Sequence, residues 1–484
     1  VTLANAAALG AGPVTLGDAA TGTNAVSLLA SAAATYANSL VISAQAVGPV
    51  TIGTTNISPG AANAQFSGKL TLNRDVTLQA GSTNRTTFAG QVTGIGNVLV
   101  TSPYAAGRRV VFDRPSGGAN DFAGSIVVSS NAWLQIGATN SIGNRCIPDT
   151  AAVSFYPGAQ LRFAPTGSGD TETVDALSSL SPGAGTVDMI SGSTFTLVLG
   201  GNNGSGWFGG SLANSAGSLA LVKIGTGTQT LAGASTYTGP TAILGGTLAF
   251  GPAGSAASSP TLDVKAGAVL DGTALTAGLT IPAAQTLTGN GAVLGNVLVN
   301  GTLAPGPSAG GLSFSNNLAL AGVARLEIHK TGTTLANGFA TVAGTLTFGG
   351  ALVVTNTGET LAPGDSFPLF PAAAYRGSFA SLVLPALPAS MHWDLARLPV
   401  NGTLRVATTT PPQLAAGLSS GGTFQLQFPS EYGVDYVLQT ATSLVTPISW
   451  VNVSTNAGTG APLTLAPPTD PDQVQAFYRV IVYY

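Results

Sequence analysis

The segment Leu221–Phe250, LVKIGTGTQTLAGASTYTGPTAILGGTLAF, alternates short apolar runs with glycine and carries a single charged side chain, Lys223. In its last run, Thr-Leu-Ala-Phe, a strand conformation would place Leu248 and Phe250 on one face, because successive side chains of a strand point to opposite faces. The glycines before that run accept the positive φ of a tight turn without steric penalty. The segment therefore predicts short strands separated by turns.

The same unit recurs along the chain, which indicates a repeat architecture. Its Gly-Thr-Leu core occurs in GGTLAF (Gly245–Phe250), NGTLAP (Asn300–Pro305), AGTLTF (Ala343–Phe348) and NGTLRV (Asn401–Val406), and in degenerate form in GAQLRF (Gly158–Phe163). Other period-two runs are GKLTLNRDVTLQA (Gly68–Ala80), GSIVVSSNAWLQIG (Gly124–Gly137), TFTLVLGG (Thr194–Gly201) and GTLTFGGALVVTN (Gly344–Asn356). One segment rich in Ala and Ser, Val26–Leu40, is a candidate for a short helix or a loop insertion.

Units this short cannot bury an apolar face alone and must stack on neighbours. We therefore predict an all-β chain: an irregular parallel β-solenoid over residues 1–407, with roughly 20–25 residues per coil. Equivalent positions of successive coils lie about 4.8 Å apart, where stacked like charges would repel. After the Pro-containing linker TTTPPQ, residues 408–484 predict a small antiparallel β-sandwich.

Composition excludes several classes of function. Charged residues make up 7% of the 484 residues, against about 25% in an average soluble domain. The net charge is −3 with no basic stripe, which argues against nucleic acid as a partner. No apolar run approaches the ~20 residues of a membrane-spanning helix, and Cys146 is the only cysteine, so no intramolecular disulfide forms. Because the chain starts at Val1 inside a repeat-like strand, we expect a processed or partial product of an exported protein.

The segment Leu221–Phe250 closely resembles the autotransporter-associated β-strand repeat of secreted bacterial surface proteins. SPTLDVKAGAVLDG (Ser259–Gly272) and the run Thr286–Phe314 also resemble segments that follow this repeat. The resemblance implies a right-handed, passenger-type β-helix displayed at or beyond the surface of a bacterium, and it implies no catalytic activity. The matching positions are Lys223, Gly225, Gly227, Leu231, Gly233, Thr236, Tyr237, Thr238, Gly239, Thr241, Gly246, Thr247 and Leu248.

Acidic residues are the first candidates for chemistry. GDTETVD holds Asp170, Glu172 and Asp175, and on a strand Asp170 and Glu172 would share a face suited to Ca²⁺. A solvated loop with three acids is the interpretation we favour. Asp263 and Asp271 flank a repeat turn, where a structural role is expected.

Histidine and cysteine add little to this picture. Each histidine has an acid two residues away, Glu327 beside His329 and Asp394 beside His392, which on a strand would share its face. Neither has a nearby Cys or second His to complete a metal site, so partly buried structural residues are expected. Cys146 is interpreted as a buried or idle thiol rather than a nucleophile.

Aromatic and basic side chains are candidates for ligand binding and not for catalysis. Trp133, Trp207 and Phe208 are candidates for stacking on sugars, although stacked core aromatics are the favoured interpretation. Trp393 and Trp450 lie in apolar surroundings. The only basic cluster is interpreted as a surface patch and consists of Arg108, Arg109 and Arg114.

No catalytic, cofactor-binding or metal-binding residue is assigned from the sequence. We expect an extracellular, non-enzymatic structural protein that assembles with itself into a surface fibre, tube or layer, through the solenoid ends and the C-terminal module. The repeat-like start, VTLANAAALG, without a polar capping unit favours this hypothesis. Two alternatives stay open: a carbohydrate-binding or polysaccharide-cleaving β-helix, with acids and aromatics on one face, and a monomeric tethered adhesin that binds surface glycans.

Overall fold

A computed structural model describes residues 1–55, 63–81, 85–103, 108–113, 119–137, 146–306, 310–388, 390–408, 411–431, 434–467 and 475–483. Regular structure in these ranges is almost entirely strand, and the helical turns are η1 (Ala19–Thr21) and α1 (Leu398–Asn401). The chain divides into two compact units, Val1–Thr302 and Leu303–Tyr484. The prediction of an all-β chain built on parallel coils is confirmed.

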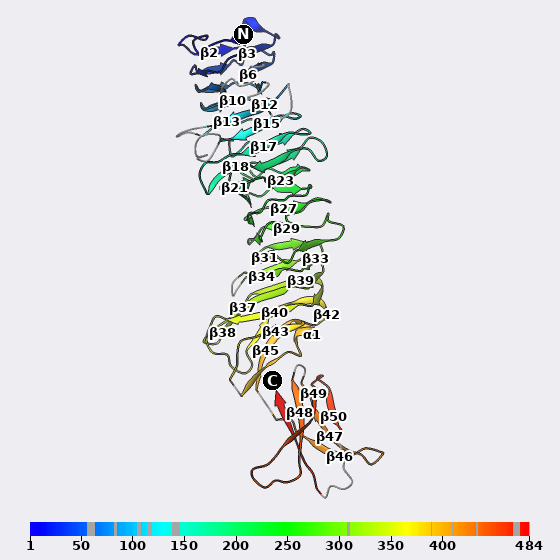
Figure 1. Ribbon diagram of the computed structural model, residues 1–484. Coiled ribbons are helices and arrows are strands. Elements are labelled where there is room, and N and C mark those ends of the chain that lie inside the picture. The colour runs from blue at the N-terminus through cyan, green and yellow to red at the C-terminus, as the bar shows by residue number, and fades with distance from the viewer. Residues whose placement is uncertain are drawn as a thin grey trace. The chain divides into compact units, whose positions relative to one another are not determined.

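The first unit begins with coils that contribute a strand to each of three parallel sheets (Figure 1). One sheet contains β1 (Thr2–Leu3), β3 (Val26–Ala30), β6 (Val50–Thr54), β9 (Val76–Gln79), β12 (Val98–Thr101), β14 (Ile126–Val128), β16 (Val153–Phe155) and β19 (Leu177–Ser179). The second contains β4 (Thr35–Tyr36), β7 (Ala64–Phe66), β10 (Arg85–Phe88), β13 (Arg109–Phe112), β15 (Trp133–Ile136), β17 (Gln160–Phe163), β20 (Thr186–Met189) and β23 (Ser211–Asn214). The third contains β2 (Val14–Leu16), β5 (Leu40–Ile42), β8 (Leu70–Leu72) and β11 (Val92–Gly94).

Two further parallel sheets begin from residue 170 onward and contain the later strands of this unit. One runs through β18 (Asp170–Val174), β21 (Thr194–Leu199), β24 (Ser218–Lys223), β26 (Thr241–Ile243), β28 (Thr261–Val264) and β31 (Thr286–Gly289). The other includes β22 (Gly206–Phe208), β25 (Thr228–Leu231), β27 (Thr247–Phe250), β29 (Val269–Asp271), β32 (Ala292–Leu294), β30 (Leu279–Ile281) and β33 (Val297–Val299). The strand β34 (Thr302–Pro305), which begins at the end of this unit, pairs with β31 in the first of these two sheets.

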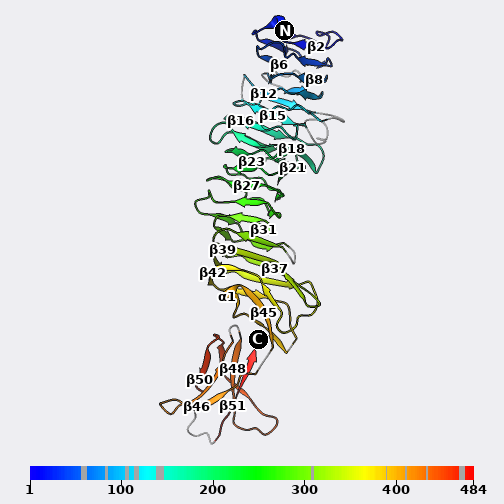
Figure 2. The same cartoon turned by 180° about the vertical axis from the view of Figure 1, so that it is seen from behind.

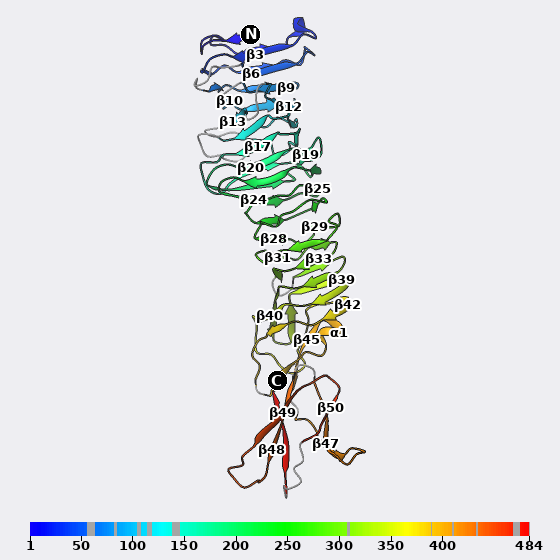
Figure 3. The same ribbon diagram turned by 45° about the vertical axis from the view of Figure 1, so that its right-hand side comes forward.

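Inward-facing side chains form columns because paired strands keep the same register from coil to coil. In the second sheet Tyr36, Phe66, Phe88 and Phe112 pair in succession and are all buried. Figure 3 shows β10, β13, β17 and β20 in this order along the stack of coils. Each buried ring therefore lies directly above or below the ring of a neighbouring coil.

Coil length is less regular than the repeats predict. Leu279 pairs with Val297 across a short coil, whereas Leu40 pairs with Leu70 across a much longer one. Both pairs keep apolar residues in register, because a longer turn can be added without changing the strands that it joins. The predicted solenoid is irregular, as expected, but its coil lengths exceed the expected range in both directions.

The Ala- and Ser-rich segment Val26–Leu40 is neither a helix nor a loop insertion. It contains β3 and β4, and β3 pairs in parallel with β1 and β6. Leu28 and Ala30 point into the core at a strand period of two. Pairing with two neighbouring strands outweighs the high helix propensity of Ala.

The second unit continues with parallel strands and ends in antiparallel ones (Figure 2). The parallel pairs involve β35 (Gly311–Phe314), β36 (Leu318–Leu320), β37 (Val323–Thr331), β39 (Phe339–Phe348), β40 (Ala351–Asn356), β42 (Ala372–Gly377) and β43 (Ser381–Val383), and β38 (Thr334–Asn337) folds back on β37 as a hairpin. An antiparallel sheet follows, with β41 (Ser366–Pro368), β45 (Thr403–Thr408) and β44 (Met391–Asp394). The Gly-Thr-Leu copy at Asn401–Val406 therefore lies in an antiparallel strand and not in a parallel coil.

The predicted small sandwich is present at the C-terminal end. One sheet has β46 (Ala415–Leu418), β47 (Phe424–Pro429) and β50 (Pro462–Leu465), and the other has β49 (Val451–Ala457), β48 (Asp435–Ala441) and β51 (Phe477–Tyr483). Leu426 and Phe428 of the first sheet share one core with Tyr436 and Leu438 of the second. The division at residues 407 and 408 stays a prediction.

Candidate functional site

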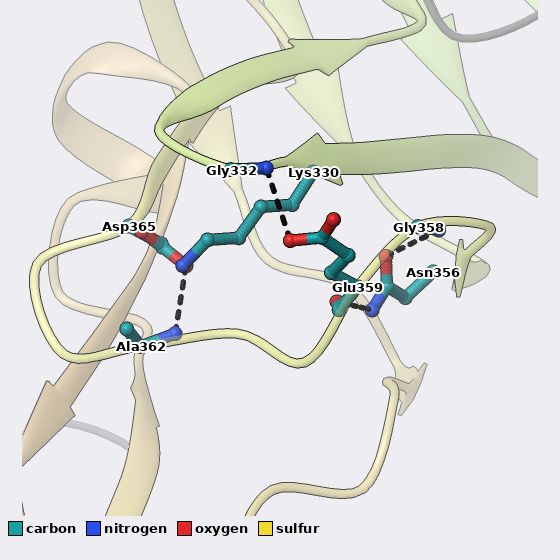
Figure 4. Close-up of polar contacts among 7 residues, drawn as sticks. All are labelled: Lys330, Gly332, Asn356, Gly358, Glu359, Ala362 and Asp365. Atoms are coloured by element: carbon teal, nitrogen blue, oxygen red, sulfur yellow. Dashed lines mark hydrogen bonds and ion pairs between the residues drawn. The ribbon is translucent and has the colours of Figure 1, made fainter.

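A crowded polar corner lies in the second unit, where the loop 357–365 packs on the β37–β38 hairpin (Figure 4). Lys330 Nζ lies 2.8 Å from Asp365 Oδ2, and the two side chains are only 12% and 13% exposed. The same carboxylate oxygen accepts the backbone N–H of Ala362 at 2.7 Å. The charge of Lys330 is thus neutralised within the corner.

The other polar groups of this corner also hold backbone. Glu359 Oε2 accepts the N–H of Gly332 at 3.0 Å, and Asn356 Nδ2 donates to the carbonyl of Glu359 at 2.9 Å (Figure 4). His329 lies next to them, with Nδ1 3.2 Å from Thr357 Oγ1. Because each of these side chains has a protein partner, the arrangement fastens a loop to a hairpin and presents no free acid and base pair.

The acids of GDTETVD separate from one another in the structure. Asp170 and Glu172 lie on the strand β18, and the expectation of a solvated loop was wrong. Glu172 is buried and accepts the N–H of Ile147 at 2.6 Å and that of Cys146 at 3.2 Å. Asp175 follows the strand and accepts two N–H groups of the next coil through Oδ1. Across the described ranges, no three His, Cys, Asp or Glu side chains are grouped closely enough to hold a metal ion.

Lys223, a position of the repeat resemblance, is buried inside the solenoid. Its Nζ donates to the carbonyl of Ile224 at 2.6 Å. Burial lowers the pKa of Lys223, and the carboxylate of Asp175 acts in the opposite direction. Asp175 therefore joins neighbouring coils, whereas Lys223 binds a backbone carbonyl of its own coil.

The remaining acids and histidine also have local partners. Asp263 pairs with Lys265 at 2.7 Å, and Asp271 accepts the N–H of Thr273 at 2.9 Å. His392 is buried, with Nε2 2.6 Å from Glu431 Oε2.

The two acids predicted to share a strand face with the histidines, Asp394 and Glu327, lie in different surroundings. Asp394 lies 3.6 Å from Arg397 rather than pairing with His392. Glu327 does lie on the exposed side of β37, where His329 is half-buried. Cys146 is buried.

The expectation of stacked core aromatics is confirmed for Phe208 and is wrong for Trp207 and Trp133. Trp207 is 45% exposed, whereas its neighbour Phe208 is buried against Phe155 with ring centroids 5.4 Å apart. Trp133 faces outward on β15 beneath the Arg162 guanidinium, whose Cζ lies 4.2 Å from the ring centroid.

Trp450 makes a similar contact with Arg479 at 4.3 Å, and Trp393 Nε1 donates to the carbonyl of Pro385 at 2.9 Å. Arg108 and Arg109 lie at the start of β13, and Arg114 falls outside the described residues.

Sequence reasoning missed two buried polar networks. Tyr237 Oη lies 2.6 Å from Thr241 Oγ1, which lies 3.0 Å from Ser259 Oγ. The Gln229 amide pairs with both backbone groups of Leu177, two coils away, at 2.9 and 3.0 Å. The signal in both cases was a polar side chain at an inward position of an alternating run.

Replacing Tyr237 with phenylalanine should destabilise the protein by about 1 kcal/mol at neutral pH, since Thr241 loses a hydrogen-bond partner. Burial strongly raises the pKa of Tyr237. The neutral phenol therefore stabilises the fold fully below its ordinary pKa of about 10, and this contribution falls as the pH rises above that value. Urea unfolding at neutral and alkaline pH should show a shallower alkaline loss in Tyr237→Phe than in the parent protein. Equal losses would contradict the assignment.

Residues 221–250 match the family model described as Passenger-associated-transport-repeat. A comparison with curated proteins finds no match. The matched residues run from the middle of β24 through β27 and include the buried Lys223 and Tyr237. A passenger-type repeat within a β-solenoid fits a secreted surface protein. Among the helices described, none has the length and apolar character needed to cross a membrane.

Proposed function

We propose that this protein is an extracellular structural protein of a bacterial surface that has no catalytic activity and associates with copies of itself into a fibre, tube or layer. The proposal rests on the observation that charged side chains inside the protein bind its own backbone or each other. Glu172 and Asp175 bind backbone N–H groups, and Lys330 is paired with Asp365. Such groups stabilise a scaffold, whereas general acid–base catalysis needs groups within reach of a substrate.

The C-terminal sandwich supports self-association. All four residues of its edge strand β46 are exposed, Leu418 by 72%, and the strand contains neither charge nor proline. In the described part of the chain, β46 pairs only with β47, so its outer edge offers free backbone groups. An uncharged edge can pair antiparallel with the same edge of a second copy about a two-fold axis. Because that contact closes a dimer, continued growth needs a second contact, which we assign to a solenoid end.

Replacing Leu418 with lysine should weaken self-association by about tenfold or more, because a charge on an edge strand opposes pairing. The measurement is sedimentation velocity over a range of protein concentrations, with electron microscopy of the same samples for filaments. Leu244→Lys is the matched control, since Leu244 is a 48% exposed leucine of the first unit, directly after β26. A parent protein that stays monomeric throughout, or equal effects of the two substitutions, would overturn the proposal and favour a tethered adhesin.

Carbohydrate binding is the second candidate function, because Trp207 is 45% exposed. Exposed aromatic rings present an apolar face to ligands such as sugars. Polysaccharide cleavage is distinguished from binding by the release of reducing ends, which we expect to be absent.

A further inference from the structure

Three arginines gather on the outer face of the sheet that contains β10, β13, β15 and β17. Arg85 pairs directly with Arg109 in the next coil, and Arg109 pairs with Trp133 in the coil after it. Arg162, on β17, lies over the Trp133 ring at 4.2 Å. Figure 3 shows β10, β13 and β17 one above another. With about 4.8 Å between paired strands, the four strands from β10 to β17 span roughly 15 Å along the stacking direction.

In the described part of the chain, this row is neutralised only in part, by the charge of Asp188, which pairs with Arg162 in the next coil. The Nε atoms of Arg85, Arg109 and Arg162 are shielded from solvent and have no hydrogen-bond partner. No ion pair joins any of the three to an acid in the described ranges. Asp188, the acid that acts on Arg162, accepts the N–H of Ser215 at 2.8 Å and its hydroxyl at 2.7 Å.

Stacked like charges are costly in a coil, and the pKa of Arg109 reflects this. Burial lowers the pKa of Arg109 first, and the charges of Arg85 and Arg162 lower it further. Arginine nevertheless stays charged in proteins. A chain with 7% charged residues therefore holds three cations together on one face, with Asp188 beside Arg162 in the next coil.

We propose that Arg85, Arg109 and Arg162 form a binding site for an acidic polysaccharide, with successive carboxylate or sulfate groups held by successive guanidinium groups. The planar guanidinium fork matches both anions with paired hydrogen bonds. The row extends over several coils, which suits an extended polyanion better than a single ion. Trp133 is a positioning residue, because its ring holds Arg162 by a cation–π contact.

Nucleic acid fits this row less well. The ring of Trp133 is engaged by Arg162, so no free aromatic platform for a base is offered here. The net charge of −3 also opposes the broad phosphate contacts on which nucleic-acid affinity depends. The site goes beyond the proposed structural role and does not require self-association.

The test measures binding of the full chain to polygalacturonate, dextran sulfate, neutral dextran and single-stranded DNA at about 50 and 200 mM salt. We expect the two acidic polysaccharides to bind, with the preferred one identifying carboxylate or sulfate as the natural group, and neutral dextran not to bind. The double substitution Arg85→Gln with Arg109→Gln should weaken binding by about tenfold or more and flatten the salt dependence. Removing the like-charge contact should leave the melting temperature unchanged or higher.

The matched control is Arg325→Gln with Arg376→Gln, which removes the same charge from two exposed arginines on β37 and β42. Its affinity should change by less than about twofold. Trp133→Phe should keep most of the affinity and Trp133→Ala should lose about fivefold, because phenylalanine retains a ring face for Arg162. Failure to bind either acidic polysaccharide, equal losses in the two double variants, or tighter binding of single-stranded DNA would overturn the proposal.

Discussion

Replacing Phe66 with alanine is expected to lower the free energy of unfolding by about 3–5 kcal/mol. Phe66 is buried between two rings, with centroids 5.3 Å from those of both Tyr36 and Phe88 and interplanar angles of 25° and 15°. The substitution therefore leaves a cavity and removes two aromatic contacts, each worth about 0.5–1.5 kcal/mol beyond the buried area. Chemical denaturation followed by circular dichroism measures the loss.

Phe66→Leu separates the two contributions. Leucine fills most of the volume but makes neither aromatic contact, so we expect a loss of about 1–3 kcal/mol. If alanine cost no more than leucine, the column Tyr36, Phe66, Phe88 would not act as a packed stack. The large effect is expected because each ring of an in-register solenoid supports the coils on both sides.

Much of the fold follows from local patterns in the sequence. The run Gly68–Ala80 predicts two strands, and the structure has β8 and β9 there. Period-two alternation decides which side chains face the core of any coil, whatever the coil's length. The segment Val26–Leu40 was misjudged because its composition favours helix while the neighbouring strands select β pairing.

The polar sites could not be derived in the same way. Glu172 and Lys223 occupy inward positions, where their partners are backbone groups that no sequence motif encodes. The contact of Arg85 with Arg109 depends on coil length, which differs between β30 with β33 and β5 with β8. A shift of one residue in a turn moves a side chain to another register. Alternation thus predicts which side chains form the core, whereas contacts between outward-facing side chains of neighbouring coils depend on turn lengths.

Glycines that end a strand are the other positions where turns control stacking. Gly289 has φ +112° and pairs with Val264 of the preceding coil, and a Cβ there would lie 2.0 Å from the Val264 carbonyl oxygen. Gly94 repeats the arrangement, with φ +110° and a Cβ position 2.2 Å from the carbonyl oxygen of Leu72. Both glycines are therefore required by backbone angle and by space.

Replacing Gly289 with alanine should cost about 3 kcal/mol or more, since the strained φ alone costs about 1–3 kcal/mol and the backbone must also move away from Val264. Gly267→Ala is the matched control, because Gly267 has φ +77° but no atom within 4 Å of the added Cβ. We expect the control to lose only about 1–2 kcal/mol from the left-handed conformation. Denaturation midpoints of the two variants, with hydrogen exchange at β28 and β31, measure the difference. Equal losses would mean that coils separate easily at Gly289, whereas a larger loss there would show that close backbone approach between coils limits which turns the solenoid accepts.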